Sequence, residues 1–264
     1  GELVRNILEF IQSLHLEEKL SPRRNSEIIW FYIFLPSLVT YLYFLSQYLN
    51  QKPFIGSIEI LDPSLFNSII DPLNKIEIIA TNLTWAEGPL WITDDNLPHL
   101  VFSDTIQNRI FKWEEGKGMF TIGKTIYVEK SGCRSNLTYC DNTFEAGSNG
   151  LLRRDDSSFD IIAALHGDRA IGLLRDDGTR SFVATHYKQQ RLNSPNDLIW
   201  SPEGHLYFTD PPYGLMDEKQ VIHNQELEHS GVYLIKSDYV QLAMDYGEPT
   251  AYVRLLESKL TRPN

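Results

Sequence analysis

The stretch NDLIWSPEGHLYFTDPPYGL, residues 196–215, contains the pattern that decides the fold class of this chain. It opens with an oxygen-donor residue and an acidic residue, continues as a short apolar strand, turns through polar residues and returns as a second apolar strand. The segment GVYLIKSD, residues 231–238, supplies a third strand. Short strands that are rich in β-branched and aromatic residues and bounded by turn residues indicate an all-β protein.

Two earlier stretches have the same layout, and in both the oxygen donor is followed by glycine. They are EGPLWITDDNLPHLVFSDTIQNRIFKW, residues 87–113, and NGLLRRDDSSFDIIAALHGDRAIGLLRDDG, residues 149–178. The strands that we expect lie at 75–81, 99–104, 109–113, 159–165, 171–177, 180–186, 205–210 and 231–236, with no long helical pattern between them. A sandwich, a barrel or a propeller would fit such strands. The repeat of one meandering sheet per unit favours a β-propeller over residues 75–264.

The donor residues of the three units are Glu87, Asn149 and Asn196. If each begins the innermost strand of its blade, all three point toward one central axis although they are distant in sequence. One carboxylate with neutral amide oxygens is a hard-oxygen site that suits Ca²⁺. Because no Cys or His stands at these positions, a transition metal is disfavoured.

The bulk composition limits the function classes. The chain has 264 residues, 42% of them hydrophobic and 22% charged, and a formal net charge of −11. A nucleic-acid-binding protein would present a basic surface, so no nucleic-acid partner is expected. Cys133 and Cys140 are too few for a disulfide scaffold and match no zinc spacing. In an oxidising compartment they could close a small loop, and otherwise they are two free thiols.

Residues 1–74 have a different character. Residues 28–49, IIWFYIFLPSLVTYLYFLSQYL, carry no charge and are long enough to span a bilayer as a helix. Basic residues precede the run, so the positive-inside rule predicts a single-pass signal anchor with the C-terminal domain lumenal or extracellular. A cleaved signal peptide or a buried helix are the alternatives. The sequons at Asn82 and Asn136 are candidate glycosylation sites and agree with export.

Six motifs in collinear order resemble the family of gluconolactonases, senescence-marker protein and luciferin-regenerating enzyme, and are most similar to its bacterial gluconolactonase branch. They are WAEGPLW (85–91), GSNGL (147–151), HGDR (166–169), RLNSPNDL (191–198), YFTDPPYGL (207–215) and LTRPN (260–264). The resemblance covers most of residues 75–264. It implies a six-bladed propeller with a divalent cation, usually calcium, although Zn²⁺ or Mn²⁺ is also possible.

The resemblance also implies a function and a set of site residues. The activity would be hydrolysis of a lactone or related ester, with the metal ligands Glu87, Asn196 and Asn264. A fourth ligand, an Asp that also serves as general base, belongs to a motif that this sequence does not contain. Because the chain starts at Gly1 and stops inside a motif, we expect the natural protein to be longer and this chain alone to be inactive. Candidates for substrate contacts around the metal are Asn149, Asp197, His166, Asp210 and Tyr213.

Two other readings of the same sequence stay open. A paraoxonase-type or strictosidine synthase-like enzyme would share the architecture, because fold does not fix function. A calcium-stabilised propeller could also be a non-catalytic lumenal binding platform. The sequence does not identify the lactone or the oligomeric state.

Overall fold

The computed structural model describes residues 59–71, 76–93, 98–115, 125–134, 140, 143–154, 160–175 and 177–260. All of them belong to one compact unit that begins at Lys52. The predicted span 28–49, the sequon residue Asn136 and the predicted ligand Asn264 lie outside the described residues. Within the described ranges, no helix is both long enough and apolar enough to cross a bilayer.

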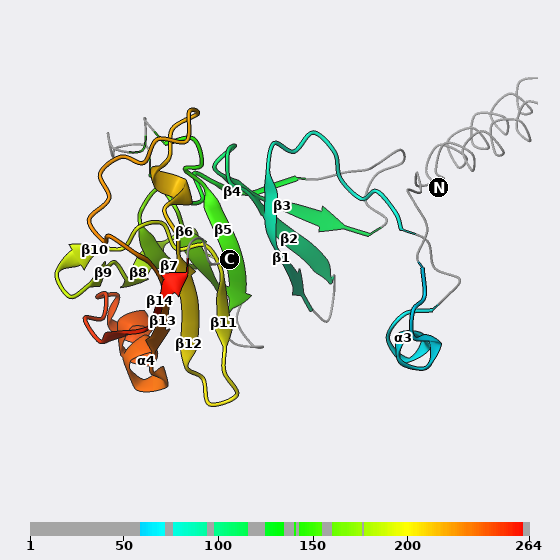
Figure 1. The fold of residues 1–264 in the computed structure, drawn as a ribbon. Helices are drawn as coiled ribbons and strands as arrows, with labels where there is room; N and C mark the ends of the chain where they lie inside the picture. Colours follow the sequence, from blue (N-terminus) through cyan, green and yellow to red (C-terminus); the bar gives the residue numbers. More distant parts are fainter. Residues whose placement is uncertain are drawn as a thin grey trace, which may run out of the picture. The chain divides into compact units, whose positions relative to one another are not determined.

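Three four-stranded antiparallel sheets follow one another along the chain, each with its strands in sequence order, like the blades of a propeller. The first contains β1 (Ala86–Ile92), β2 (His99–Asp104), β3 (Arg109–Glu114) and β4 (Thr125–Glu129). The second contains β5 (Ser148–Arg153), β6 (Ile161–Leu165), β7 (Ala170–Leu174) and β8 (Arg180–Ala184). The third contains β11 (Leu198–Trp200), β12 (Leu206–Asp210), β13 (Ser230–Ile235) and β14 (Val253–Leu260). Figure 1 shows this succession from β1 to β14.

The smaller elements connect these sheets. They are the hairpin of β9 (His186–Tyr187) and β10 (Gln190–Arg191), the 3-10 turn η3 (Tyr213–Leu215), and the helices α3 (Pro63–Ile69) and α4 (Ser237–Tyr246). The sequence shows no long helical pattern between the strands, and the short helix α4 was not predicted. In α4, Val240, Ala243 and Met244 recur at helical spacing and are buried, while Gly247, in the left-handed conformation, ends the helix. The buried face of this short helix packs against the hydrophobic core of the second and third sheets.

The second and third strands of each sheet confirm the sequence prediction to within three residues. The outer strands β4 and β14 were not predicted. In β14 most residues are exposed, so the strand lacks the apolar alternation that reveals a half-buried strand. The strand predicted at 75–81 was wrong, because among residues 76–81 only Glu77 has bridge geometry. An alternating pattern favours extended backbone, but a strand also needs a paired neighbour.

The core explains why the sheets stack face to face. Every residue of β6 is buried, and neighbouring side chains on a strand point to opposite faces. Ile161, Ala163 and Leu165 belong to an apolar cluster shared with the first sheet, around Val101 and Ile110. Ile162 and Ala164, the alternate residues of β6, instead join a cluster with residues of the third sheet, such as Phe208 and Tyr233. The second sheet is thus packed between the other two.

Candidate functional site

The first strands of the three sheets lie next to one another, with β5 contacting both β1 and β11. The backbone N–H of Gly150 donates a hydrogen bond of 2.8 Å to the carbonyl oxygen of Asn196. On the other side, Ser103 Oγ of the first sheet donates to the carbonyl oxygen of Asn149 at 2.8 Å. The segments that contain Glu87, Asn149 and Asn196 therefore form one row, although 109 positions separate the first donor from the last.

The glycines that follow two of the donors are required by this close approach. A Cβ atom on Gly88 would overlap the carbonyl group of Asn149, and Gly88 also has a positive φ of +54°. A Cβ atom on Gly150 would lie 2.7 Å from Oδ1 of Asp197. The register of β1 and of β5 shifts close to the donor in both strands, between Glu87 and Leu90 and between Ser148 and Leu151. The repeat read from the sequence is therefore a repeat of backbone geometry as well.

The donor side chains fit a hard cation. Glu87 is half-buried and accepts a 3.1 Å hydrogen bond from Nε1 of Trp85. Asn149 and Asn196 are 5% and 6% exposed, and in the part of the chain that is described their side-chain amides have no hydrogen-bond partner. The side-chain oxygens of these two amides can serve as neutral ligands together with the carboxylate of Glu87. Within the described ranges no three His, Cys, Asp or Glu side chains gather around a common point, so an oxygen site here depends on the asparagines.

Glu145, which the sequence analysis did not single out, lies close to this row. Burial raises the pKa of Glu145, and the charge of Glu87 raises it further, so the two carboxylates lie within electrostatic range of each other. Oε2 of Glu145 is 3.6 Å from Nδ1 of His166. Glu145 stands two positions before the GSNGL motif and belongs to no periodic pattern, so only its proximity to the motif could have drawn attention to it.

His166 and Asp210, both expected to contact substrate, are completely buried. Burial lowers the pKa of His166 to about 4, so its ring is neutral at neutral pH. The ring packs directly beneath Gly214 of the η3 turn. Burial raises the pKa of Asp210 to about 7, and its Oδ2 accepts a 2.8 Å hydrogen bond from the backbone N–H of Asn193. Asp210 therefore fastens the loop that leads into Asn196.

The two remaining candidates are more accessible. Asp197 is exposed, and its Oδ1 accepts a hydrogen bond from the N–H of Leu198 at 2.8 Å. Tyr213 is half-buried in the η3 turn. That turn is tied to the RLNSPNDL loop because Ser194 Oγ accepts a hydrogen bond from Gly214 N and donates one to the carbonyl oxygen of Pro211. Hydrogen bonds thus join the motifs 191–198 and 207–215 to each other in the part of the fold that carries Asn196.

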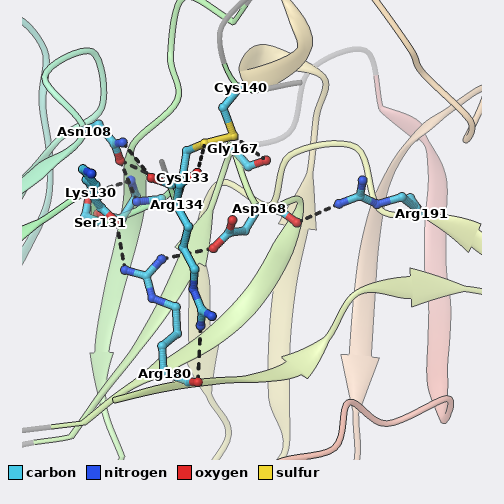
Figure 2. A network of polar contacts seen from close by, with 12 residues as sticks. Asn108, Lys130, Ser131, Cys133, Arg134, Cys140, Gly167, Asp168, Arg180 and Arg191 are labelled. Carbon is cyan, nitrogen blue, oxygen red and sulfur yellow. Dashed lines mark hydrogen bonds and ion pairs between the residues drawn. A yellow bond between two sulfur atoms is a disulfide. The ribbon is translucent and has the colours of Figure 1, made fainter. Parts of the chain in front are cut away.

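The turn of residues 166–169 anchors several segments at once (Figure 2). The buried carboxylate of Asp168 accepts a 3.0 Å hydrogen bond from Arg180, which also donates to the carbonyl oxygen of Lys130. Arg191 donates to the carbonyl oxygen of Asp168 at 2.9 Å. Arg169 is buried in the left-handed conformation and donates to the carbonyl oxygen of Leu192 at 2.7 Å. The turn that carries His166 is therefore fastened to the start of the loop of residues 191–198.

A disulfide joins Cys133 and Cys140, so the first of the two alternatives for these cysteines holds. Its sulfur on Cys140 lies 3.6 Å from the carbonyl oxygen of Gly167, against the turn just described (Figure 2). The sequon residue Asn82 is exposed, in the left-handed conformation. The disulfide fits an oxidising compartment, and the glycosylation of Asn82 stays a prediction.

Comparison with known proteins agrees with this geometry. Residues 85–248 match the SMP-30/gluconolactonase/LRE-like region. The chain is 36% identical over 214 residues to a gluconolactonase of Zymomonas mobilis, and the match covers 80% of this chain and 52% of the relative. The structure of a gluconolactonase from Xanthomonas campestris aligns with a TM-score of 0.51 and 26% identity, over 69% of this chain and 50% of that one.

The chain thus spans about half the length of these relatives. The family match covers the three donor segments at Glu87, Asn149 and Asn196 and all the predicted substrate-contact residues. It extends over more than half of the chain, from Trp85 to just beyond the end of α4. The chain belongs to the SMP-30/gluconolactonase/LRE-like family.

Proposed function

We propose that this protein hydrolyses a lactone in a calcium-dependent reaction, within a six-bladed β-propeller. The observation that carries the proposal is the row of strand starts at Glu87, Asn149 and Asn196, where two nearly buried amides have no partner among the described residues. The similarity to gluconolactonases supports a cyclic ester as the substrate class.

The outer face of the third sheet supports a larger propeller. Ile199 on β11 and Leu256 on β14 point away from the second sheet and are 64% and 41% exposed. Large apolar side chains on a sheet face usually pack against another layer. Further blades on this face would bury them and would bring additional donors to the central axis.

Glu87, Asn196 and the predicted ligand Asn264 would hold the cation, and Asn149 is placed to contact it, its water or the substrate. Oxygen ligands of this kind suit Ca²⁺, although Zn²⁺ and Mn²⁺ are further candidates. When bound, the cation would supply Lewis acidity that polarises the lactone carbonyl. Among these ligands only Glu87 is charged. Because the amide ligands are neutral, they would reduce the Lewis acidity of the cation little.

The other residues act around the reacting ester. Asp197 and Tyr213 are accessible enough to bind hydroxyl groups of the substrate. Asp210 and His166 are buried, so we assign them to positioning the loops of Asn196 and Tyr213 rather than to contact with the lactone. An acidic residue outside this sequence would accept the proton of the attacking water, as the family resemblance implies.

The test is hydrolysis of glucono-δ-lactone by the full-length protein, followed by pH-stat titration, with calcium and with excess chelator. We expect turnover that needs calcium and that falls about a hundred-fold or more in Glu87→Gln, as loss of a metal contact predicts. Glu203→Gln, the same change at an exposed turn between β11 and β12, is the matched control and should retain full activity. A folded protein that binds calcium but cleaves neither lactones nor esters would refute the proposal and favour a binding propeller.

The location is a separate proposal. We propose that residues 28–49 anchor the protein in a membrane with the propeller on the exported side. The Cys133–Cys140 disulfide supports this, because disulfides persist in oxidising compartments. A shift in mobility after endoglycosidase treatment, lost in Asn82→Gln with Asn136→Gln, would be expected from an exported domain.

A further inference from the structure

Three large apolar side chains are exposed at the end of the sheets that carries the donor residues. Trp85 is 52% exposed, Phe144 42% and Ile222 39%, and we call these three residues the apolar rim. Trp85 and Phe144 precede the first strands β1 and β5, and Ile222 stands in the connection from β12 to β13. Because β12 is antiparallel to β11, its end lies beside the start of β11. The apolar rim therefore shares the end of the sheets at which the donor residues lie.

Further blades do not explain the exposure of the apolar rim. Ile199 and Leu256 lie on the face of a sheet, where another sheet can cover them. The rim residues lie outside the strands, in the segments at the sheet ends. Such segments, held by a rigid scaffold, are where binding residues are most often found. A group of exposed apolar side chains beside a candidate site indicates a contact surface.

Trp85 is tied directly to the donor row. Its indole Nε1 donates a 3.1 Å hydrogen bond to Oε1 of Glu87, so the ring lies beside that carboxylate. The carbonyl oxygen of Trp85 accepts a hydrogen bond from the N–H of Thr105 at 3.1 Å. The carbonyl oxygen of Thr105 accepts one from Gly147 at 2.7 Å, three residues after Phe144. Trp85 and the segment of Phe144 are thus both bonded to the residue that follows β2.

Phe144 is joined in turn to the segment that contains Ile222. The N–H of Phe144 donates to the carbonyl oxygen of Met216 at 2.9 Å, and Met216 pairs with Ile222 in an isolated β-bridge. The N–H of His223 donates to the carbonyl oxygen of Leu215 at 2.9 Å, which fixes the same turn from its other side. Backbone hydrogen bonds therefore connect the apolar rim from the first sheet, past the start of β5, to the third sheet.

We propose that the apolar rim binds an apolar substituent of the substrate, so that the preferred substrate is a lactone whose ring carries an alkyl chain rather than a sugar lactone. The inference rests on the proposed function for the lactone itself. Asp197 and Tyr213 offer polar contacts on the β11 side of the row, and Trp85 offers an apolar surface beside Glu87. The chain leaves water on contact with the rim, and this removal of apolar surface from water stabilises the complex.

A series of δ-lactones that differ only in chain length tests the proposal. δ-Valerolactone has no chain, and δ-hexalactone, δ-octalactone and δ-decalactone carry alkyl chains of increasing length on the same ring. Hydrolysis by the full-length protein with calcium is followed by pH-stat titration. We expect kcat/KM to rise about two-fold for each added methylene, half the effect in free energy of complete burial. The rise should come from a fall in KM, because the rim contacts the chain before and during the reaction. A kcat/KM that stays constant or falls along the series would overturn the proposal.

Two substitutions of Trp85 separate its two contacts. Trp85→Gln keeps a side-chain N–H for Glu87 but removes the apolar surface, so the rise per methylene should become clearly smaller. Trp85→Phe keeps an aromatic surface but has no N–H, so the rise per methylene should remain even if the overall rate falls. Tyr246→Gln removes an aromatic side chain that is 77% exposed on α4 and should leave the chain-length dependence unchanged. Circular dichroism shows that each variant is folded.

Binding of the matching δ-lactams, whose amide bond resists hydrolysis, gives a readout that needs neither catalysis nor a variant. Calorimetric titration of the wild type should show affinity rising about two-fold per methylene, with a heat capacity of binding that becomes more negative. If the lactams bind with this dependence but no lactone is cleaved, the apolar rim is a binding surface and the proposed reaction is wrong. If glucono-δ-lactone is cleaved but neither rate nor affinity depends on the chain, the reaction stands and the inference is wrong.

Discussion

Replacing Gly88 by alanine tests the close approach of the first two strand starts. Gly88 has a φ of +54°, and a Cβ atom there would overlap the carbonyl group of Asn149. Both atoms of that carbonyl are backbone, so no side-chain rotation can relieve the contact. Gly88→Ala must therefore either strain its own backbone or push β5 away from β1.

Two costs contribute to the expected loss of stability. The left-handed conformation costs an alanine about 1–2 kcal/mol, and overpacking in a rigid site costs about 1–3 kcal/mol. Gly178 separates these costs, because its φ is +80° and a Cβ atom there would meet nothing within 4 Å. Gly178→Ala therefore carries only the first cost, and Gly88→Ala should be less stable than this control by about 1–3 kcal/mol.

The assay is urea unfolding of the wild type and both variants, followed by circular dichroism, with the free energy of unfolding extrapolated to water. In a thermal scan, the extra loss in Gly88→Ala corresponds to a further fall in Tm of roughly 5 °C. Calcium affinity should also fall, because Asn149 is displaced from Glu87. If Gly88→Ala is no less stable than Gly178→Ala, the strand starts are not packed as described and the proposed site loses its geometric basis.

Two further predictions concern the buried acid and the disulfide. Burial raises the pKa of Asp210 to about 7, so the folded state holds this proton more tightly than the unfolded state and loses stability as the pH rises from about 4 to about 7. The asparagine of Asp210→Asn cannot ionise, so in urea unfolding this variant should gain stability relative to the wild type between about pH 5 and about pH 8. An equal pH dependence of the two proteins would contradict the prediction. Replacing Cys133 and Cys140 by serine opens a loop with a sequence separation of 7 and should lower the free energy of unfolding by about 2 kcal/mol, as measured against the oxidised protein. If the reduced wild type and the double variant do not unfold at the same urea concentration, loss of the cross-link is not the cause.

Local features of the chain predicted most of the sheet structure. Segments such as HLVFSD and HLYFTD alternate in a period of two, and both became the second strands of their sheets at nearly the predicted residues. The donor residue before glycine in β1 and β5 marked the start of an innermost strand, because close backbone packing there excludes a side chain. Exposed outer strands such as β14 and the short helix α4 were missed, since neither carries a strong periodic signal over enough residues.

The sequence by itself determined the oxygen-donor chemistry of Glu87, Asn149 and Asn196 and the repeating unit that carries them, because residue type and spacing are local properties. Only the tertiary structure decided which other groups join them. The segment that follows Glu145 is hydrogen-bonded both to Thr105, after β2, and to the turn of His166, and the side chains of His166 and Asp210 are completely buried. Burial and neighbouring charge set what an ionisable group does, and both arise only when distant segments pack together.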